Sequence, residues 1–208
     1  MKKIIALLAV VSVLSLSAVS MAKPEKGWHK GVYILGGVGS LNVDHDTNVV
    51  TNAAFGKNRI LGYGLTIGDN FLDFLAAELQ ARYGTDTAGG NKEHAANFDL
   101  NIKYSLILDA LTRMEKVRIL PYIKAGGGLF GAAVPSNDAG NNRFGVYGPS
   151  ADFGAGVEVL LLKKLYVGAD FTENLVWLKE KTNAAGVRIL AGGFDPQDSF
   201  FGYVGVHF

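Results

Sequence analysis

The chain contains no cysteine and only 5 prolines among its 208 residues. Without cysteine there is no disulfide framework, no Cys-ligated zinc site, no cysteine nucleophile and no lipid attached through cysteine. The scarcity of proline and the absence of a Gly-X-Y repeat exclude collagen and Pro-rich linkers. An excess of positive charge is missing too, because 20 basic residues face 19 acidic ones. This balance argues against a dedicated nucleic-acid binder, which needs a basic face.

Charged residues are scarce at 19% of the chain, whereas 49% of the residues are hydrophobic and 27 are glycine. This glycine content is about twice the average usage. The many Leu, Val, Ile and Phe residues exclude an intrinsically disordered chain. The length fits one domain, or at most two small ones. The composition therefore indicates a folded, apolar and glycine-rich domain.

The first 22 residues have the layout of a secretory signal peptide. A basic start precedes an apolar stretch at 4–14, and Ser20-Met21-Ala22 places small residues at −3 and −1 of a cleavage point. The apolar stretch is too short to be a good membrane span, so a retained N-terminal anchor is the less favoured alternative. We expect export and removal of residues 1–22, which leaves residues 23–208 as one domain.

After residue 22, no stretch longer than 13 residues lacks Asp, Glu, Lys and Arg, which is too short for a transmembrane helix. Apolar and polar residues alternate with a period of two instead, as in 98–106. Because a strand sends successive side chains to opposite faces, each such segment has one apolar and one polar face. The pattern predicts eight strands, at about 31–43, 58–68, 73–84, 96–108, 117–134, 146–161, 165–178 and 199–208.

The connections between these predicted strands alternate in length. The long ones are 44–57, 85–95, 135–145 and 179–198, and the short ones are 69–72, 109–116 and 162–164. Gly68-Asp69-Asn70 is a turn signal at the first short connection. Alternating long and short connections are typical of barrels that cross an outer membrane, with long loops outside and tight turns in the periplasm. Since a bilayer tolerates no open sheet edge, the predicted fold is an all-β, eight-stranded antiparallel up-and-down transmembrane barrel.

The polar faces of the predicted strands carry nine charged side chains at mid-strand depth. Glycines accompany them, and the interior of an eight-stranded barrel has room only for packed side chains. Because an unpaired charge is costly in such an interior, we predict a lumen filled by side chains that form an ion-pair network. Its predicted members are Glu78, Arg82, Asp99, Lys103, Arg118, Lys124, Asp152, Glu158 and Asp170.

One charge departs from the alternation of the seventh predicted strand. Counting from Phe171, the alternation places Glu173 on the apolar face, where a charge is disfavoured in a bilayer. Either this residue lies near the outer membrane interface, or a β-bulge shifts the register.

The chain stops at Phe208, at the end of its last predicted strand. One face of this strand carries Phe200, Val204, Val206 and Phe208. A terminal Phe preceded by alternating hydrophobic residues resembles the signal by which assembly machinery recognises outer-membrane barrels. The resemblance implies that this machinery is a partner of the chain.

Three segments of the second half resemble the small OmpA-type outer-membrane barrels. Pro121–Gly128 is similar to the fifth strand of that family, and Ser150–Glu158 to its sixth. Lys163-Lys164 and the following Leu165–Phe171 are similar to the rest of its sixth-to-seventh hairpin. The resemblance implies an integral barrel in the outer membrane of a Gram-negative-type bacterium, in contact with its lipid.

No catalytic, metal or cofactor site emerges from the pattern. A serine nucleophile needs a nearby histidine, yet no histidine stands in a His-x-Ser pattern or at mid-strand. Asp44-His45-Asp46 would ligate a metal only if three adjacent loop residues converged on one ion. Gly126-x-Gly128-x-x-Gly131 matches a dinucleotide fingerprint by letter, but it lies within a predicted strand rather than at a strand-to-helix turn. The four histidines are His29, His45, His94 and His207.

We therefore expect a non-enzymatic, monomeric barrel with a structural or surface-interaction role, no cofactor and no nucleic-acid partner. Its outer loops would carry specificity, but they contain no motif that identifies a ligand. One alternative is a narrow channel or a lateral path for small hydrophobic molecules, against which the central charges argue. The other is a lipid-modifying enzyme, which would need a Ser/His constellation at a rim that holds His45, His94 or His207.

Overall fold

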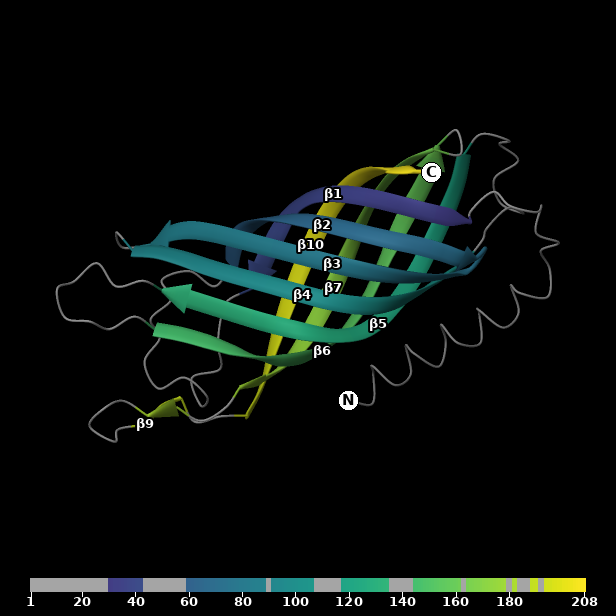
Figure 1. Ribbon diagram of the computed structural model, residues 1–208. Coiled ribbons are helices and arrows are strands. Elements are labelled where there is room, and N and C mark those ends of the chain that lie inside the picture. The colour runs from purple at the N-terminus through teal and green to yellow at the C-terminus, as the bar shows by residue number, and fades with distance from the viewer. Residues whose placement is uncertain are drawn as a thin grey trace.

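The chain folds into a closed barrel of eight antiparallel strands, as predicted (Figure 1). The computed structural model describes residues 30–42, 59–88, 91–106, 117–134, 144–161, 164–178, 181–182, 188–190 and 193–208. The barrel strands are β1 (Gly31–Asn42), β2 (Arg59–Leu72), β3 (Leu75–Ala88), β4 (Asn91–Ser105), β5 (Val117–Val134), β6 (Phe144–Leu161), β7 (Leu165–Leu178) and β10 (Gly193–His207). Each strand pairs with the barrel strand before and after it, and β10 pairs with β1 to close the barrel.

The remaining two strands, β8 (Lys181–Thr182) and β9 (Arg188–Leu190), pair in a small separate sheet within the predicted connection 179–198. Within the described residues, no helix is long and apolar enough to span a membrane. The predicted signal peptide, His29 and the segment Asp44-His45-Asp46 lie outside these residues.

The first turn lies later in the chain than predicted. Strand β2 continues through Gly68-Asp69-Asn70 to Leu72, with a register shift between Asp69 and Leu72, and the turn falls at residues 73–74. Gly68 serves packing instead of turning, because a Cβ there would lie only 2.2 Å from Cζ of Tyr33. The turn-like composition at this point therefore reflects a close approach inside the barrel.

The prediction of a long connection at 85–95 is wrong. Strands β3 and β4 continue as a paired ladder in which Thr85 faces His94 and Ala88 faces Asn91. His94 consequently lies on a strand and not in a loop. The polar residues here resemble a loop by composition, but backbone ladder bonds form regardless of side-chain polarity where a hairpin extends into water.

Strand β10 begins at Gly193, six residues earlier than predicted. Its first half contains Pro196, which cannot donate a ladder hydrogen bond and weakens the strand signal of the sequence. Pairing with β7 nevertheless continues through this region, with Asp195 opposite Val176 and Asp198 opposite Glu173. The extension places Asp195 in the lumen, where 1% of its surface is exposed.

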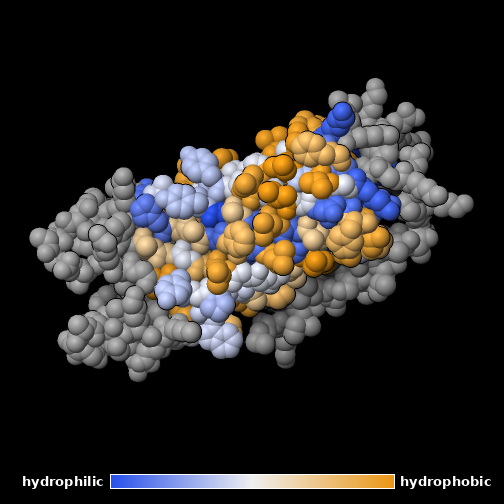
Figure 2. Space-filling view, viewed as in Figure 1, coloured by the Kyte–Doolittle hydropathy of each residue, from blue (hydrophilic) through white to orange (hydrophobic). Residues whose placement is uncertain are grey.

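The strands send hydrophobic side chains to the outer wall and polar or small ones to the lumen. Strand β4 is typical, because Phe98, Leu100 and Ile102 are about half or more exposed while Asp99 and Asn101 are fully buried. Figure 2 shows hydrophobic side chains covering much of the middle of the wall on the face in view. The wall is thus apolar and the interior polar, which is the reverse of a soluble domain.

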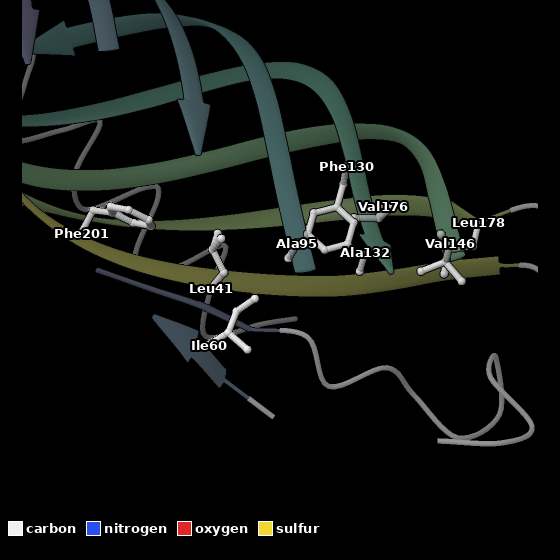
Figure 3. Close-up of a cluster of buried hydrophobic side chains, with 9 residues drawn as sticks. All are labelled: Leu41, Ile60, Ala95, Phe130, Ala132, Val146, Val176, Leu178 and Phe201. Carbon is white, nitrogen blue, oxygen red and sulfur yellow. The ribbon is translucent and has the colours of Figure 1, made fainter. Parts of the chain in front are cut away.

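Two apolar layers close the lumen above and below its polar middle. The outer layer lies at the strand ends that face the longer connections (Figure 3). Its members are Leu41, Ile60, Ala95, Phe130, Ala132, Val146, Val176, Leu178 and Phe201. The inner layer lies at the end with the short turns and contains Tyr33, Leu35, Ala76, Leu120, Leu160 and Tyr166.

Candidate functional site in the barrel lumen

All nine charged residues of the predicted network point into the lumen, and none is more than 8% exposed. They come from five neighbouring strands, β3 to β7. The period-two alternation places them there, because each occupies an inward position of its strand. The structure brings six of them together in ion pairs, and these six form two groups. The six are Glu78, Arg82, Lys103, Lys124, Glu158 and Asp170.

The first group consists of one lysine between two glutamates. The Nζ atom of Lys103 lies 2.8 Å from Oε1 of Glu78 and 2.8 Å from Oε1 of Glu158. Tyr33 donates a hydrogen bond of 2.6 Å to Glu78, and Tyr203 donates one of 3.3 Å to Glu158. The lysine ammonium also lies 4.4 Å from the centre of the Tyr33 ring, within the range of a cation–π interaction. The group carries one net negative charge.

The second group is the converse, one aspartate between two bases. Nη2 of Arg82 donates to both carboxylate oxygens of Asp170, at 2.8 and 2.9 Å, and Nζ of Lys124 donates to Oδ2 at 2.6 Å. Lys124 also donates to Gln80, and Arg82 donates to Ser199. This group carries one net positive charge, so the two groups together are neutral.

Tyr122 connects the two groups. Its hydroxyl lies 2.9 Å from the hydroxyl of Tyr203 and donates a 3.4 Å hydrogen bond to Oδ2 of Asp170. Because Tyr203 bonds to Glu158, the path runs from the first group to the second without leaving the lumen. A continuous hydrogen-bonded network of this kind holds its members rigidly.

Glycines on the neighbouring strands make room for the long side chains of the network. A Cβ at Gly156 would lie 2.5 Å from the hydroxyl oxygen of Tyr122, and one at Gly154 would lie 2.7 Å from Cε of Lys124. Real Cβ atoms do not approach so closely, so these positions exclude any larger residue unless the network moves. The excess of glycine in the composition is explained in part by this crowding.

Three of the nine residues lie outside the two ion-pair groups. Arg118 is buried near the turn end of β5, two residues before Leu120 of the inner apolar layer. Asp99 and Asp152 lie nearer the outer end, on β4 and β6, and both are fully buried. Neither carboxyl group of this pair has a hydrogen-bond partner among the described residues.

The sequence matches the family described as outer membrane protein beta-barrel domain over residues 6–206. The chain belongs to this family. Its fold is similar to that of Neisserial surface protein A, with a TM-score of 0.59 and 12% identity over 86% of this chain and 97% of the other.

Two further solved outer-membrane barrels share the fold. The N-terminal barrel domain of Pseudomonas aeruginosa OprF has a TM-score of 0.51 and 14% identity, covering 86% of this chain and 98% of the other. The attachment invasion locus protein Ail of Yersinia pestis has a TM-score of 0.51 and 12% identity, covering 86% and 99%. At such identities the likeness concerns the fold alone. No curated protein matches the sequence.

A small cavity of about 10 Å³ lies in the lumen of this outer-membrane barrel, beside Arg82 and Asp170 and under Phe201. This volume is about that of one water-sized sphere. Side chains therefore fill the lumen at the level of the second group, and the outer apolar layer adjoins the cavity through Phe201.

The four residues of the predicted assembly signal lie on the outer wall of β10, where each is 44–73% exposed. They are Phe200, Val204, Val206 and Phe208. Strand β10 pairs with both β7 and β1, so this last strand closes the barrel. Its outward hydrophobic face continues the hydrophobic outer wall of the barrel.

Glu173 does point outward, and the ladders of β7 show no register shift around it. The β-bulge alternative is therefore wrong. Glu173 faces Asp198, which accepts a 2.7 Å hydrogen bond from Asn42 and forms an ion pair with Arg59. Asn42 and Arg59 are the outermost described residues of β1 and β2, so Glu173 belongs to a polar row at the outer ends of these two strands.

The two described histidines do not assemble a nucleophilic site. Nδ1 of His94 lies 2.7 Å from the hydroxyl of Tyr83 on the neighbouring strand. The ring of His207 packs edge-on against Tyr166, at 5.9 Å between centres. In the described part of the chain, no three His, Cys, Asp or Glu side chains come together as they would around a metal ion.

Sequence reasoning missed several members of the lumen network. Tyr33 and Gln80 are buried and bonded to charged partners, but their types carry no distinctive signal at inward positions. Asp195 falls within the predicted connection 179–198, because the pattern predicts that the last strand begins at residue 199. Its burial follows only from the longer strand, which the ladder with β7 reveals.

Proposed function

We propose that this chain is a monomeric structural barrel of the outer membrane that conducts no solutes. The observation that carries the proposal is the filled lumen, in which a neutral ion-pair network lies between two apolar layers. An eight-stranded barrel of this kind is a packed plug and not a pore. Residues 1–22 direct export, and the apolar wall contacts outer-membrane lipid.

We further propose that the connections at the outer end of the barrel, including the hairpin of β3 and β4, contact a partner outside the cell. The hairpin of β3 and β4 supports this, because its paired strands continue to Ala88 and Asn91 with polar residues. Such residues fit water better than lipid and would display the loops away from the membrane. Ail, a protein of the same fold, is named for attachment and invasion, which makes a surface role a reasonable extension.

The decisive experiment for the closed lumen is conductance of the refolded mature chain in planar bilayers. We expect no reproducible conductance steps. The matched variant is Lys124→Ala, which shortens a side chain of the plug and leaves the wall unchanged. Stable conductance steps from the unmodified chain would replace the structural role with that of a channel. Flickering openings in the variant alone would show that the network closes the lumen.

Localisation and assembly are tested in cells. The full chain should fractionate with the outer membrane and migrate faster on a gel before heating than after heating, as folded barrels do. Phe208→Ser should reduce the folded fraction in cells but not the yield of refolding in detergent, if assembly machinery reads the terminal residue. A soluble periplasmic product would overturn the location, and equal losses in both settings would overturn recognition by the machinery.

A further inference from the structure

A second polar cluster lies in the lumen between the ion-pair network and the outer apolar layer. We call it the oxygen cluster and define it as Asp99, Asn101, Ser150 and Asp152. All four side chains are at least nine-tenths buried. Among the described residues, none of their carboxyl, amide and hydroxyl atoms has a partner at full hydrogen-bond distance and angle, and the side-chain amides of Asn97 and Asn101 act on the carboxyl groups of Asp99 and Asp152. The ion-pair network, by contrast, satisfies most of its polar atoms within the protein.

Two glycines of β5 form the floor of the oxygen cluster. Gly126 is paired with Asn101 on one side and with Asp152 on the other, and Gly128 is paired in the same way with Asp99 and Ser150. The cluster thus flanks β5 from β4 and β6.

The side chains from β4 lean over this floor. Oδ1 of Asp99 lies 2.4 Å from the place that a Cβ of Gly128 would take, and Oδ1 of Asn101 lies 2.5 Å from the corresponding place at Gly126. Both oxygens therefore lie above the glycines of β5. Ser150 and Asp152 are buried on β6, on the other side of these glycines, and the charge of Asp152 acts on Asp99.

Within the described part of the chain, no base forms an ion pair with Asp99 or Asp152. Arg82 and Lys124 are the positive charges that act on both aspartates, but their donor nitrogens bond to Asp170, Gln80 and Ser199. Two buried carboxylates without a bonded cation are costly, because they lose water and gain no partner.

The donor set indicates which partner would satisfy the cluster. It consists of carboxylate, amide and hydroxyl oxygens without nitrogen or sulfur ligands, which suits a hard cation. A divalent ion would balance both carboxylates at once. Calcium accepts six to eight oxygens in flexible geometry, whereas magnesium demands a stricter octahedron, so calcium fits a mixed set on two strands better.

We propose that Asp99, Asn101, Ser150 and Asp152 form a calcium site inside the barrel. The bound ion ties β4 to β6 across the glycines of β5 and thereby stabilises the outer half of the barrel. Because the ion binds the folded barrel and not the unfolded chain, stability rises with calcium concentration. The site gives the unpaired oxygens of these four residues a partner.

The test measures the unfolding temperature of the refolded mature chain in detergent, after treatment with a chelator and then with calcium. We expect calcium to raise the unfolding temperature and calorimetry to show about one ion bound per chain. Each of Asp99→Asn and Asp152→Asn should weaken calcium binding at least tenfold, and the double variant should abolish the shift. The matched control is Glu173→Gln, which removes an exposed carboxylate of the outer wall and should leave the shift intact.

Folding of the variants is checked independently. In chelator, the double variant should unfold at or above the temperature of the unmodified chain, because it no longer buries two unpaired charges. A calcium shift that persists in the double variant would place the ion elsewhere on the protein or the detergent. No shift in the unmodified chain, or an equal shift with sodium or magnesium, would likewise overturn the assignment to calcium.

Discussion

The lumen and the outer wall are built from the same eight strands, yet they obey opposite rules. In the lumen, charged side chains are fully buried and glycine is needed for space. On the wall, hydrophobic side chains such as Leu100 and Leu129 are more than 60% exposed, and a charge occurs at the edge, as at Glu173. The environment of a side chain therefore depends on the parity of its position, which means whether the alternation along the strand turns it toward the lumen or toward the outer wall. This parity decides the cost of a substitution.

Glycine shows the same contrast. Gly156 faces the lumen, where a Cβ would meet both Tyr122 and the carbonyl oxygen of Ala169 at 2.5 Å. Gly36 faces outward, and nothing lies within 4 Å of the place that its Cβ would take. Substitutions in the lumen and on the wall test this difference, from the largest expected effect to the smallest.

The largest effect is expected from Lys103→Met, which leaves Glu78 and Glu158 buried without their shared cation. Removing one partner of a buried ion pair typically costs about 3–5 kcal/mol. The free energy of unfolding, measured by urea titration of the refolded chain, should fall by that amount. Glu173→Gln, a change of charge on the wall, should cost less than about 1 kcal/mol. A loss from Lys103→Met as small as that control would mean that water solvates the lumen freely.

On the outer wall, the substitution that corresponds to an unpaired charge in the lumen is one that places a charge toward lipid. Leu100→Arg places a guanidinium near the middle of the membrane-crossing part of β4, where about 2–4 kcal/mol is the usual cost. The matched variant Leu100→Ile keeps the position apolar and should cost much less. Both are measured by unfolding in lipid vesicles. A tolerated arginine would indicate that this part of the wall is covered by something other than lipid.

Sequence reasoning recovered the parts of this molecule that follow from parity. The sequence predicts that Glu78, Asp99 and Lys103 point inward, because the residues on either side of each charge along its strand are mostly apolar. The partners of these charges were not readable, since pairing across the lumen depends on strand order and register, and a linear pattern contains neither. The link through Tyr122 and the satisfied state of Asp170 emerged only when the strands were placed side by side.

Errors in strand length have a different cause. Residues 85–94 are mostly polar and therefore show no alternation of apolar and polar residues. At the start of β10, Asp195 and Gln197 face the lumen and Phe194 and Pro196 face outward, but the proline weakens the strand signal. Both segments nevertheless pair with their neighbouring strands. The turn signal at Gly68 misled for the opposite reason, because that glycine accommodates the ring of Tyr33 inside the barrel.

The two glycines test crowding directly. Gly156→Ala should reduce the free energy of unfolding by about 1–3 kcal/mol, because the added methyl group meets a rigid carbonyl as well as the Tyr122 hydroxyl. Gly36→Ala should change it little or raise it slightly, since alanine restricts the unfolded chain and meets open space. Urea unfolding under identical conditions compares the two. Equal effects would show that the lumen relaxes around the new methyl group and that its packing is loose.

The smallest expected effect concerns the hydroxyl that links the two ion-pair groups. Tyr122→Phe removes its hydrogen bonds to Tyr203 and Asp170 but keeps the ring, and about 1 kcal/mol is the typical net value for such a loss. Tyr147→Phe is the wall control, because Tyr147 is 80% exposed and should contribute almost nothing. If the groups are coupled through Tyr122, Tyr122→Phe should also lessen the cost of Lys103→Met, because the first group would then already be separated from the second. Strictly additive losses in this double-mutant cycle would instead mean that the two groups are stable independently and that the tyrosine only fills space between them.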